Sequence, residues 1–307
     1  MMSMRSIVRG FAGRPWWTKL LVLGAGFLLV RFVVLATSLE LYHSEESQNG
    51  SLGTVVAAGP TLPLLEYIGP AEAHENGMVV NGILAAGIFR LIGESGVTLK
   101  LVWLGFALGT FLLLLPVVRR AFGDSAAWFT GLFAIAAPAF FVFMNLSDTL
   151  VDSGALFFST LVLYTCIRVL ESPRPTQINF ALLGLVCGFG AFFSYHTLTM
   201  SFTCMLFAVL PRSRRVLRVL PALVIGGLLG LLPWFVFNIS HGFWGLGIFQ
   251  GDHVVGGKSG SWMIPDLFRI VFRDLPVVFG GVDLGPIRGR WIGWVFLAGF
   301  LSSMPVL

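Results

Sequence analysis

Long apolar blocks separated by short polar segments form the main pattern along this chain. Residues 20–39, 101–118 and 127–144 are the clearest of these blocks. A stretch of about 18 or more apolar residues with few charges is long enough to cross roughly 30 Å of hydrocarbon as a helix. The pattern therefore predicts an all-α, polytopic transmembrane protein.

Composition and charge support this prediction. Hydrophobic residues make up 56% of the chain and charged residues 11%, whereas ordinary soluble domains carry about a quarter charged residues. The net charge is +5, but the basic residues come in short clusters between apolar blocks, as at Arg119-Arg120 and Arg212–Arg218. Such clusters set the orientation of membrane proteins, so we expect contacts with membrane lipids and none with nucleic acid.

The positive-inside rule arranges residues 1–307 as a single transmembrane domain with about eight spans and a cytoplasmic N-terminus. Span 1 covers 18–39, an outer loop with interfacial helices covers 40–97, spans 2–7 lie within 98–237, a second outer loop covers 238–290, and span 8 covers 291–307. Within 98–237 the spans are 99–118, 125–144, 152–169, 178–194, 197–211 and 219–237. Because the chain stops at Leu307 inside an apolar run, we expect it to be part of a longer protein.

One further segment, residues 76–93, is apolar enough to cross the membrane but carries Arg90. If it crossed, the basic clusters that follow would all face outward, so the positive-inside rule favours an amphipathic helix in the outer interface. In this arrangement only Asp124 and Glu171 of the 15 acidic residues lie inside. The carboxylates are therefore concentrated on the outer face, where we expect the functional site.

Two groups of acids on this face are candidate catalytic residues. Glu45 and Glu46 follow span 1 closely, and a carboxylate held at the headgroup layer can act as a general base toward a hydroxyl or amine. The alternative is a pair of solvated loop acids. Asp148 and Asp152 lie at a short outer turn and at the start of the next span. They either cap that helix or face the same outer cavity and bind a metal or orient an acceptor.

Other polar residues on the outer face are candidates for substrate binding. A His-Glu pair precedes the interfacial helix, without the spacing of a zinc site, and a Tyr-His pair lies between two spans, where polar groups usually have a function. In the second outer loop, two arginines four residues apart share one helix face, and their guanidinium groups suit a phosphate or pyrophosphate. Loop packing or contact with lipid headgroups is the alternative in each case. These residues are His74, Glu75, Tyr195, His196, Arg269 and Arg273.

Six short motifs follow one another along most of residues 18–250. They are the paired acids in Ser44–Ser47, the interfacial helix end at Gly87–Gly93, the Arg-Arg-x-Phe-Gly span end at Val117–Gly123, the outer turn at Asn145–Asp152, the Gly-rich span at Gly184–Tyr195, and the Pro-Trp-x-x-x-Asn step at Leu232–Asn238. In this order they resemble the bacterial GT-C membrane glycosyltransferases, in the branch similar to protein mannosyltransferases and their lipid-sugar-dependent relatives.

The resemblance implies a sugar donor linked to polyprenyl phosphate and a carboxylate base in the first outer loop. The base maps to Glu45, where the family commonly has Asp, with Glu46 beside it, and the second-loop aspartate maps to Asp148 or Asp152. The implied reaction is a single displacement with inversion, in which the carboxylate takes the acceptor proton while the polyprenyl phosphate leaves. The implied acceptor is an envelope lipid, glycan or protein at the outer face of the bacterial inner (plasma) membrane.

The resemblance also bears on how the leaving phosphate is stabilised. In relatives a lysine or arginine holds the donor phosphate; no motif here marks its counterpart, and Arg269, Arg273 and Lys258 are candidates by location alone. Some relatives use a divalent cation such as Mg²⁺ or Mn²⁺ and others do not, so the resemblance leaves the cofactor and any metal ligands open.

Two alternatives from other functional classes stay open. A transporter or lipid flippase needs ionisable residues at mid-membrane and often shows repeated halves, but the spans here hold few central charges apart from Arg31 and no repeat is visible. The second alternative is a non-catalytic protein of an envelope assembly, which would explain why Glu replaces the family's Asp at position 45. Sugar transfer from a polyprenyl-phosphate donor separates the enzyme from both.

Overall fold

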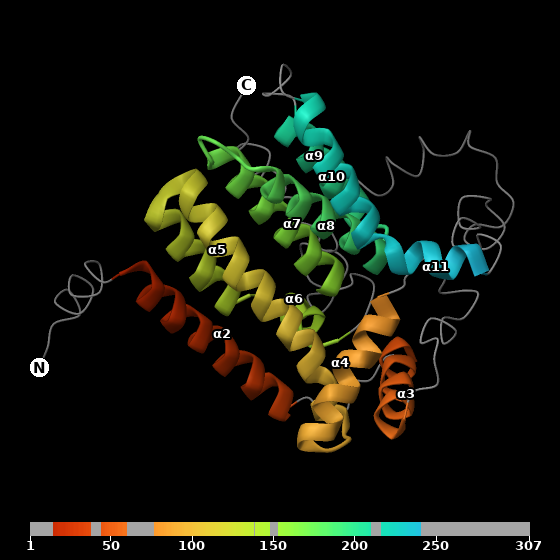
Figure 1. Ribbon diagram of the computed structural model, residues 1–307. Helices are drawn as coiled ribbons and strands as arrows, with labels where there is room; N and C mark the ends of the chain where they lie inside the picture. The colour runs from red at the N-terminus through yellow and green to blue at the C-terminus, as the bar shows by residue number, and fades with distance from the viewer. Residues whose placement is uncertain are drawn as a thin grey trace, which may run out of the picture. The chain divides into compact units, whose positions relative to one another are not determined.

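The computed structural model describes residues 15–37, 44–59, 77–137, 139–147, 153–209 and 216–240. The helices are α2 (Trp16–Thr37), α3 (Ser44–Ala58), α4 (Gly77–Ile92), α5 (Gly96–Ile135), α6 (Ala139–Met144), α7 (Ser153–Glu171), α8 (Gln177–Phe193), α9 (Thr197–Val209), α10 (Val216–Gly230) and α11 (Leu232–Ser240). The chain divides into two compact units, residues 1–136 with 144–246 and residues 137–143 with 247–307. Everything below concerns the first unit (Figure 1).

Several of the described helices fit a membrane. Helices α2, α5 and α7 are long and apolar enough to cross it, and the bent pair α10 and α11 passes the same test together. Helices α4, α8 and α9 are apolar but shorter. Large apolar side chains such as Leu29, Phe129 and Phe202 are exposed, as lipid-facing side chains would be. The predicted all-α membrane protein class is confirmed.

Helix α5 contains a reversal of the chain. Gly123 has φ 89° and ψ 175° within it, and glycine adopts positive φ without steric cost. A Cβ on Gly131 would lie 3.5 Å from Leu115 Cδ1, although these residues would be about 24 Å apart in a straight helix. The chain therefore folds back at Gly123, between the spans predicted at 99–118 and 125–144 (Figure 1).

Helices α8 and α10 approach each other backbone to backbone. A Cβ on Gly184 would overlap the Leu223 carbonyl oxygen, and a Cβ on Gly188 would overlap that of Gly227. Small residues permit such close packing, which matters in a membrane because lipid tails are as apolar as the side chains. Since higher numbers in α8 meet higher numbers in α10, the two helices run in the same direction.

A break separates α10 from α11 inside the segment predicted as one span at 219–237. The two helices are bent by 55°. Pro233 has no N–H to donate to the Leu229 carbonyl, and its ring clashes with that carbonyl. The hydrophobic pattern predicted the apolar segment, and the proline divides it into two helices.

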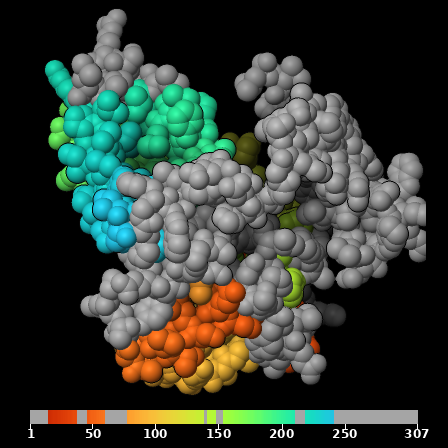
Figure 2. Space-filling model, turned by 90° about the vertical axis from the view of Figure 1, so that its right-hand side faces the viewer, coloured from red at the N-terminus to blue at the C-terminus, as the bar shows by residue number. Residues whose placement is uncertain are grey.

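Helices α3 and α4 form a tight pair in the predicted first outer loop. A Cβ on Gly82 would lie 2.5 Å from Leu52 Cγ, so the two helices pack closely. Arg90 of α4 donates to the carbonyl oxygens of Val56 (3.1 Å) and Ala57 (3.0 Å), which caps α3. Helix α4 has 16 residues, and its length of about 24 Å is short of a crossing. Figure 2 shows α3 (orange-red) and α4 (yellow-orange) on one face.

Candidate functional site

A buried ion pair joins α3 to the start of α5. Lys100 Nζ lies 3.1 Å from both carboxylate oxygens of Glu46. Glu46 is 0% exposed and Lys100 is 3% exposed. Burial of two charges is costly unless they are paired and hydrogen-bonded, so each of these side chains depends on the other to be buried at the α3–α5 junction. It also shows that Glu46 is not a solvated loop acid.

Local capping fixes where α5, the helix that carries Lys100, begins. The Ser95 hydroxyl oxygen accepts a bond from Thr98 N (3.2 Å), and the Thr98 hydroxyl oxygen accepts one from Ser95 N (2.9 Å). This reciprocal capping satisfies two of the free N–H groups at the helix start. Lys100 lies in the second turn of α5, so the capped helix start fixes the position of the backbone from which its side chain extends.

The residues that follow α6, Asn145–Ser147, lie against the ion pair and are called the Asn145–Ser147 turn below. The Leu146 carbonyl oxygen accepts a bond from Lys100 Nζ (3.2 Å), and Ser147 is 0% exposed. Asn145 Oδ1 accepts a bond from Arg31 Nη2 (3.1 Å). Two buried cations from different helices therefore meet one short turn.

Arg31 has further partners at the end of α5. Its Nη1 donates to the Ile135 carbonyl (2.9 Å) and its Nη2 to the Ala134 carbonyl (2.6 Å). The guanidinium carbon lies 3.8 Å from the centre of the Phe27 ring. Arg31 is 1% exposed, so its charge is compensated by oxygen atoms and an aromatic face in place of water.

The predicted pair Tyr195 and His196 lies between α8 and α9. Tyr195 is half-buried, and its hydroxyl oxygen accepts a bond from Trp234 Nε1 of α11 (2.8 Å). Burial raises the pKa of the Tyr195 hydroxyl. His196 is exposed. Tyr195 thus joins the end of α8 to α11, and its role in binding stays a prediction.

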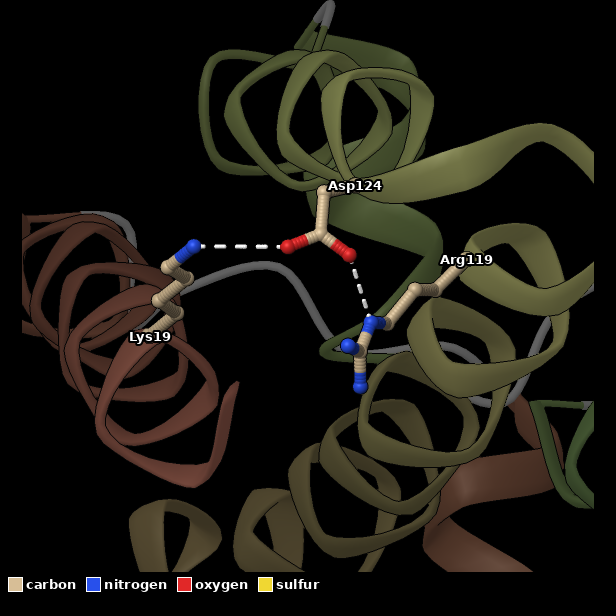
Figure 3. A network of polar contacts seen from close by, with 3 residues as sticks. All are labelled: Lys19, Arg119 and Asp124. Carbon is tan, nitrogen blue, oxygen red and sulfur yellow. Dashed lines mark hydrogen bonds and ion pairs between the residues drawn. The ribbon is translucent and has the colours of Figure 1, made fainter. Parts of the chain in front are cut away.

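A second set of charges lies at the reversal of α5. Asp124 accepts bonds from Arg119 Nε (2.6 Å) and Lys19 Nζ (3.3 Å), and Figure 3 shows both cations converging on its carboxylate. The Arg119 guanidinium holds the pKa of Asp124 below its usual value. Nearby in the sequence, Arg120 Nε lies 3.2 Å from Glu171 Oε2. These partly exposed pairs, with Lys19 buried, tie α2, α5 and α7 together where the sequence predicted the inner surface.

Most other predicted site residues lie outside the described residues. Within the described ranges, no group of three or more His, Cys, Asp or Glu residues could hold a metal ion. The structure brings Glu46 together with Lys100, which sequence analysis did not single out. The signal for Lys100 was a lone cation in an apolar segment, which requires a partner. The residues that stay untested are Glu45 (its side chain), His74, Glu75, Asp148, Asp152, Lys258, Arg269 and Arg273, with residues 241–290 of the predicted second outer loop and the predicted span 291–307.

The chain is similar to known glycosyltransferases. Residues 79–239 match the family described as dolichyl-phosphate-mannose-protein mannosyltransferase. The lipopolysaccharide core galacturonosyltransferase RgtA of Rhizobium johnstonii is 28% identical over 260 residues, covering 81% of this chain and 46% of the relative. The chain thus spans about half the length of this curated relative. No solved structure matches. The family match includes Lys100 and the Asn145–Ser147 turn.

Proposed function

The chain belongs to the dolichyl-phosphate-mannose-protein mannosyltransferase family, and we propose on this basis that the protein is a membrane glycosyltransferase. The match confirms the resemblance found in the sequence motifs. The proposed donor is a sugar linked to polyprenyl phosphate, and the proposed acceptor is an envelope glycan or lipid. The relative's name makes galacturonic acid and lipopolysaccharide core the first sugar and acceptor to test.

The family match carries the proposal of sugar transfer, and the buried Glu46–Lys100 pair decides the roles of the two adjacent glutamates. A general base must present an oxygen lone pair to the acceptor proton, whereas both Glu46 oxygens accept bonds from Lys100. We therefore assign Glu46 to positioning the start of α3 and keep Glu45, the preceding residue, as the base. This division gives each of the two adjacent acids its own role.

The proposed reaction is an inverting single displacement at the outer face of the membrane. Glu45 takes the acceptor proton as the acceptor oxygen attacks the anomeric carbon, and the bond from that carbon to the phosphate oxygen breaks. The leaving polyprenyl phosphate carries the released electron pair and needs a cation. Arg269, Arg273 and Lys258 are the proposed sources, and assays with added Mg²⁺ or Mn²⁺ and with EDTA test a metal in their place.

The test uses the full-length protein in proteoliposomes with polyprenyl-phosphate-linked galacturonic acid or mannose and a lipopolysaccharide core acceptor. Glu45→Gln should lower kcat by roughly 10²–10⁴-fold, because it removes the general base. Gln48→Ala is the matched control, since Gln48 is an exposed polar residue of the same helix, and it should keep wild-type activity. Unchanged transfer by Glu45→Gln would remove Glu45 as the base. No transfer by the wild type would favour a transporter or an assembly protein.

A further inference from the structure

We propose that Arg31 is a positioning residue that holds the Asn145–Ser147 turn and, through it, the Lys100–Glu46 pair in place for sugar transfer. This inference rests on the proposed function and extends it to a residue of α2 that sequence analysis regarded only as an isolated charge. Ionisable residues inside apolar spans are costly and usually functional. Arg31 is such a residue, 1% exposed within a 22-residue apolar helix.

The contacts of Arg31 exceed those of a simple helix cap. A cap at the end of α5 needs only the carbonyls of Ala134 and Ile135. The same Nη2 atom also donates to the Asn145 side chain at 3.1 Å, which belongs to a turn outside α5. Arg90 is an example of a simple helix cap, because it donates to the Val56 and Ala57 carbonyls at the end of α3.

The turn transmits this contact to the ion pair. Asn145 directly precedes Leu146, and only the φ and ψ angles of Leu146 lie between their shared peptide plane and the Leu146 carbonyl, so holding the Asn145 side chain restricts where that carbonyl can lie. That carbonyl accepts a bond from Lys100, and Lys100 donates to both oxygens of Glu46. The three N–H groups of an ammonium match these three acceptors. A displaced turn would therefore reorient Lys100 and shift Glu46.

A small shift there has a large kinetic effect. Misplacement of about 1 Å, even by a change distant from the reacting atoms, can slow an enzyme on the order of 100-fold. Glu46 is adjacent to the proposed base Glu45, and both lie in the first turn of α3. Arg31 therefore acts on the reaction without touching substrate, which predicts a loss in kcat with little change in KM.

Asn145 is the residue to change first, because Arg31→Met leaves buried carbonyls without a donor and risks misfolding. In the full-length protein, Asn145→Ala should lower kcat about 10- to 100-fold, because the turn and the ion pair are no longer held in place. KM should stay close to wild type, and Tm should fall modestly because one hydrogen bond to a charged group is lost. Asn145→Asp should restore most of the lost kcat, since a carboxylate also accepts from a guanidinium. Wild-type kcat in Asn145→Ala, or no recovery in Asn145→Asp, would overturn the inference.

A labelling experiment tests the turn without relying on transfer. Ser147→Cys is introduced with the three native cysteines replaced, and its reaction with a membrane-impermeant maleimide is timed. Because Ser147 is 0% exposed, labelling should be slow, and adding Asn145→Ala should speed it by at least about tenfold. Arg90→Met removes a helix cap elsewhere and should leave the rate unchanged.

The two readouts separate the failure of this inference from that of the proposed function. If the wild type transfers no sugar, the glycosyltransferase proposal fails, and fast labelling in Asn145→Ala still supports the role of Arg31 at the turn. Slow labelling in Asn145→Ala overturns that role, whether or not the protein transfers sugar. Fast labelling together with lower kcat supports both.

Discussion

Replacement of Lys100 by Met tests whether the ion pair at the α3–α5 junction is buried as described. Both Glu46 oxygens lie 3.1 Å from Lys100 Nζ, and the two side chains are 1% and 4% exposed. Removing one partner of a buried pair leaves a charge without compensation, which costs about 3–5 kcal/mol. We therefore expect Lys100→Met to lower the free energy of unfolding by about that amount.

The double variant Glu46→Leu with Lys100→Met should recover most of this loss. Replacing a buried pair by apolar residues is often neutral or stabilising by about 1–4 kcal/mol, whereas the Leu146 carbonyl loses its donor at a cost of about 1–3 kcal/mol. The two terms nearly cancel, so we expect stability within about 2 kcal/mol of wild type. The proposed positioning role of Glu46 requires that this stable double variant transfer sugar on the order of 100-fold more slowly than the wild type.

The assay is unfolding of the full-length protein in detergent micelles by denaturant, followed by far-UV circular dichroism, alongside the transfer reaction. A Lys100→Met variant within about 1 kcal/mol of wild type would refute the burial argument, since removal of an exposed pair costs no more than that. Transfer at the wild-type rate by the double variant would reduce the pair to a structural contact. It would also remove the main support for positioning through Glu46.

Two further predictions concern the close packing of α8 on α10 and the charge of Asp124. Gly188→Ala should destabilise the protein by about 1–3 kcal/mol, because the added Cβ meets the Gly227 backbone. Gly105→Ala, which meets nothing within 4 Å, should stabilise it by about 0.5–1 kcal/mol, and equal effects in thermal unfolding would contradict the packing. Asp124→Asn should lower Tm slightly at pH 7, because the depressed pKa of Asp124 means that its ionised form stabilises the fold. That difference should begin to shrink as the pH falls below about 4 and vanish once the pH is below the depressed pKa of Asp124 in the folded protein. A difference that does not shrink in acid would contradict the assignment.

Local signals in the sequence were enough for the helices and for the reversal in α5. Apolar length predicted α2 and α7 within a few residues, because a span is defined by its own composition. The basic pair before Gly123 indicated a connection between two spans, and the structure has the reversal at that glycine. Apolar length did not predict two breaks. One is the bend at Pro233, since an apolar segment containing proline either kinks or breaks, and the other is the end of α5 at Ile135 within the span predicted at 125–144.

The site depends on contacts that no local pattern contains. Glu46 and Lys100 are separated by 54 positions, and Arg31 and Asn145 by 114. The sequence indicated that a carboxylate of the first loop is functional, but the choice between adjacent glutamates requires knowing which one has a buried partner. A lone charge in an apolar segment signals that a partner exists, and only the fold identifies it.

The distance between the two sets of charges relates the site to the membrane. Lys100 lies in the second turn of α5 and Arg119 near the end of its first half, and the helix between them is about 28 Å long at 1.5 Å per residue. This length is close to the roughly 30 Å of bilayer hydrocarbon, so the Glu46–Lys100 pair and the Lys19–Asp124–Arg119 cluster fit opposite membrane surfaces. Because basic clusters favour the cytoplasmic side, the proposed orientation puts the ion pair at the outer headgroup layer. A donor anchored in the bilayer by its polyprenyl chain would present its phosphate at that depth.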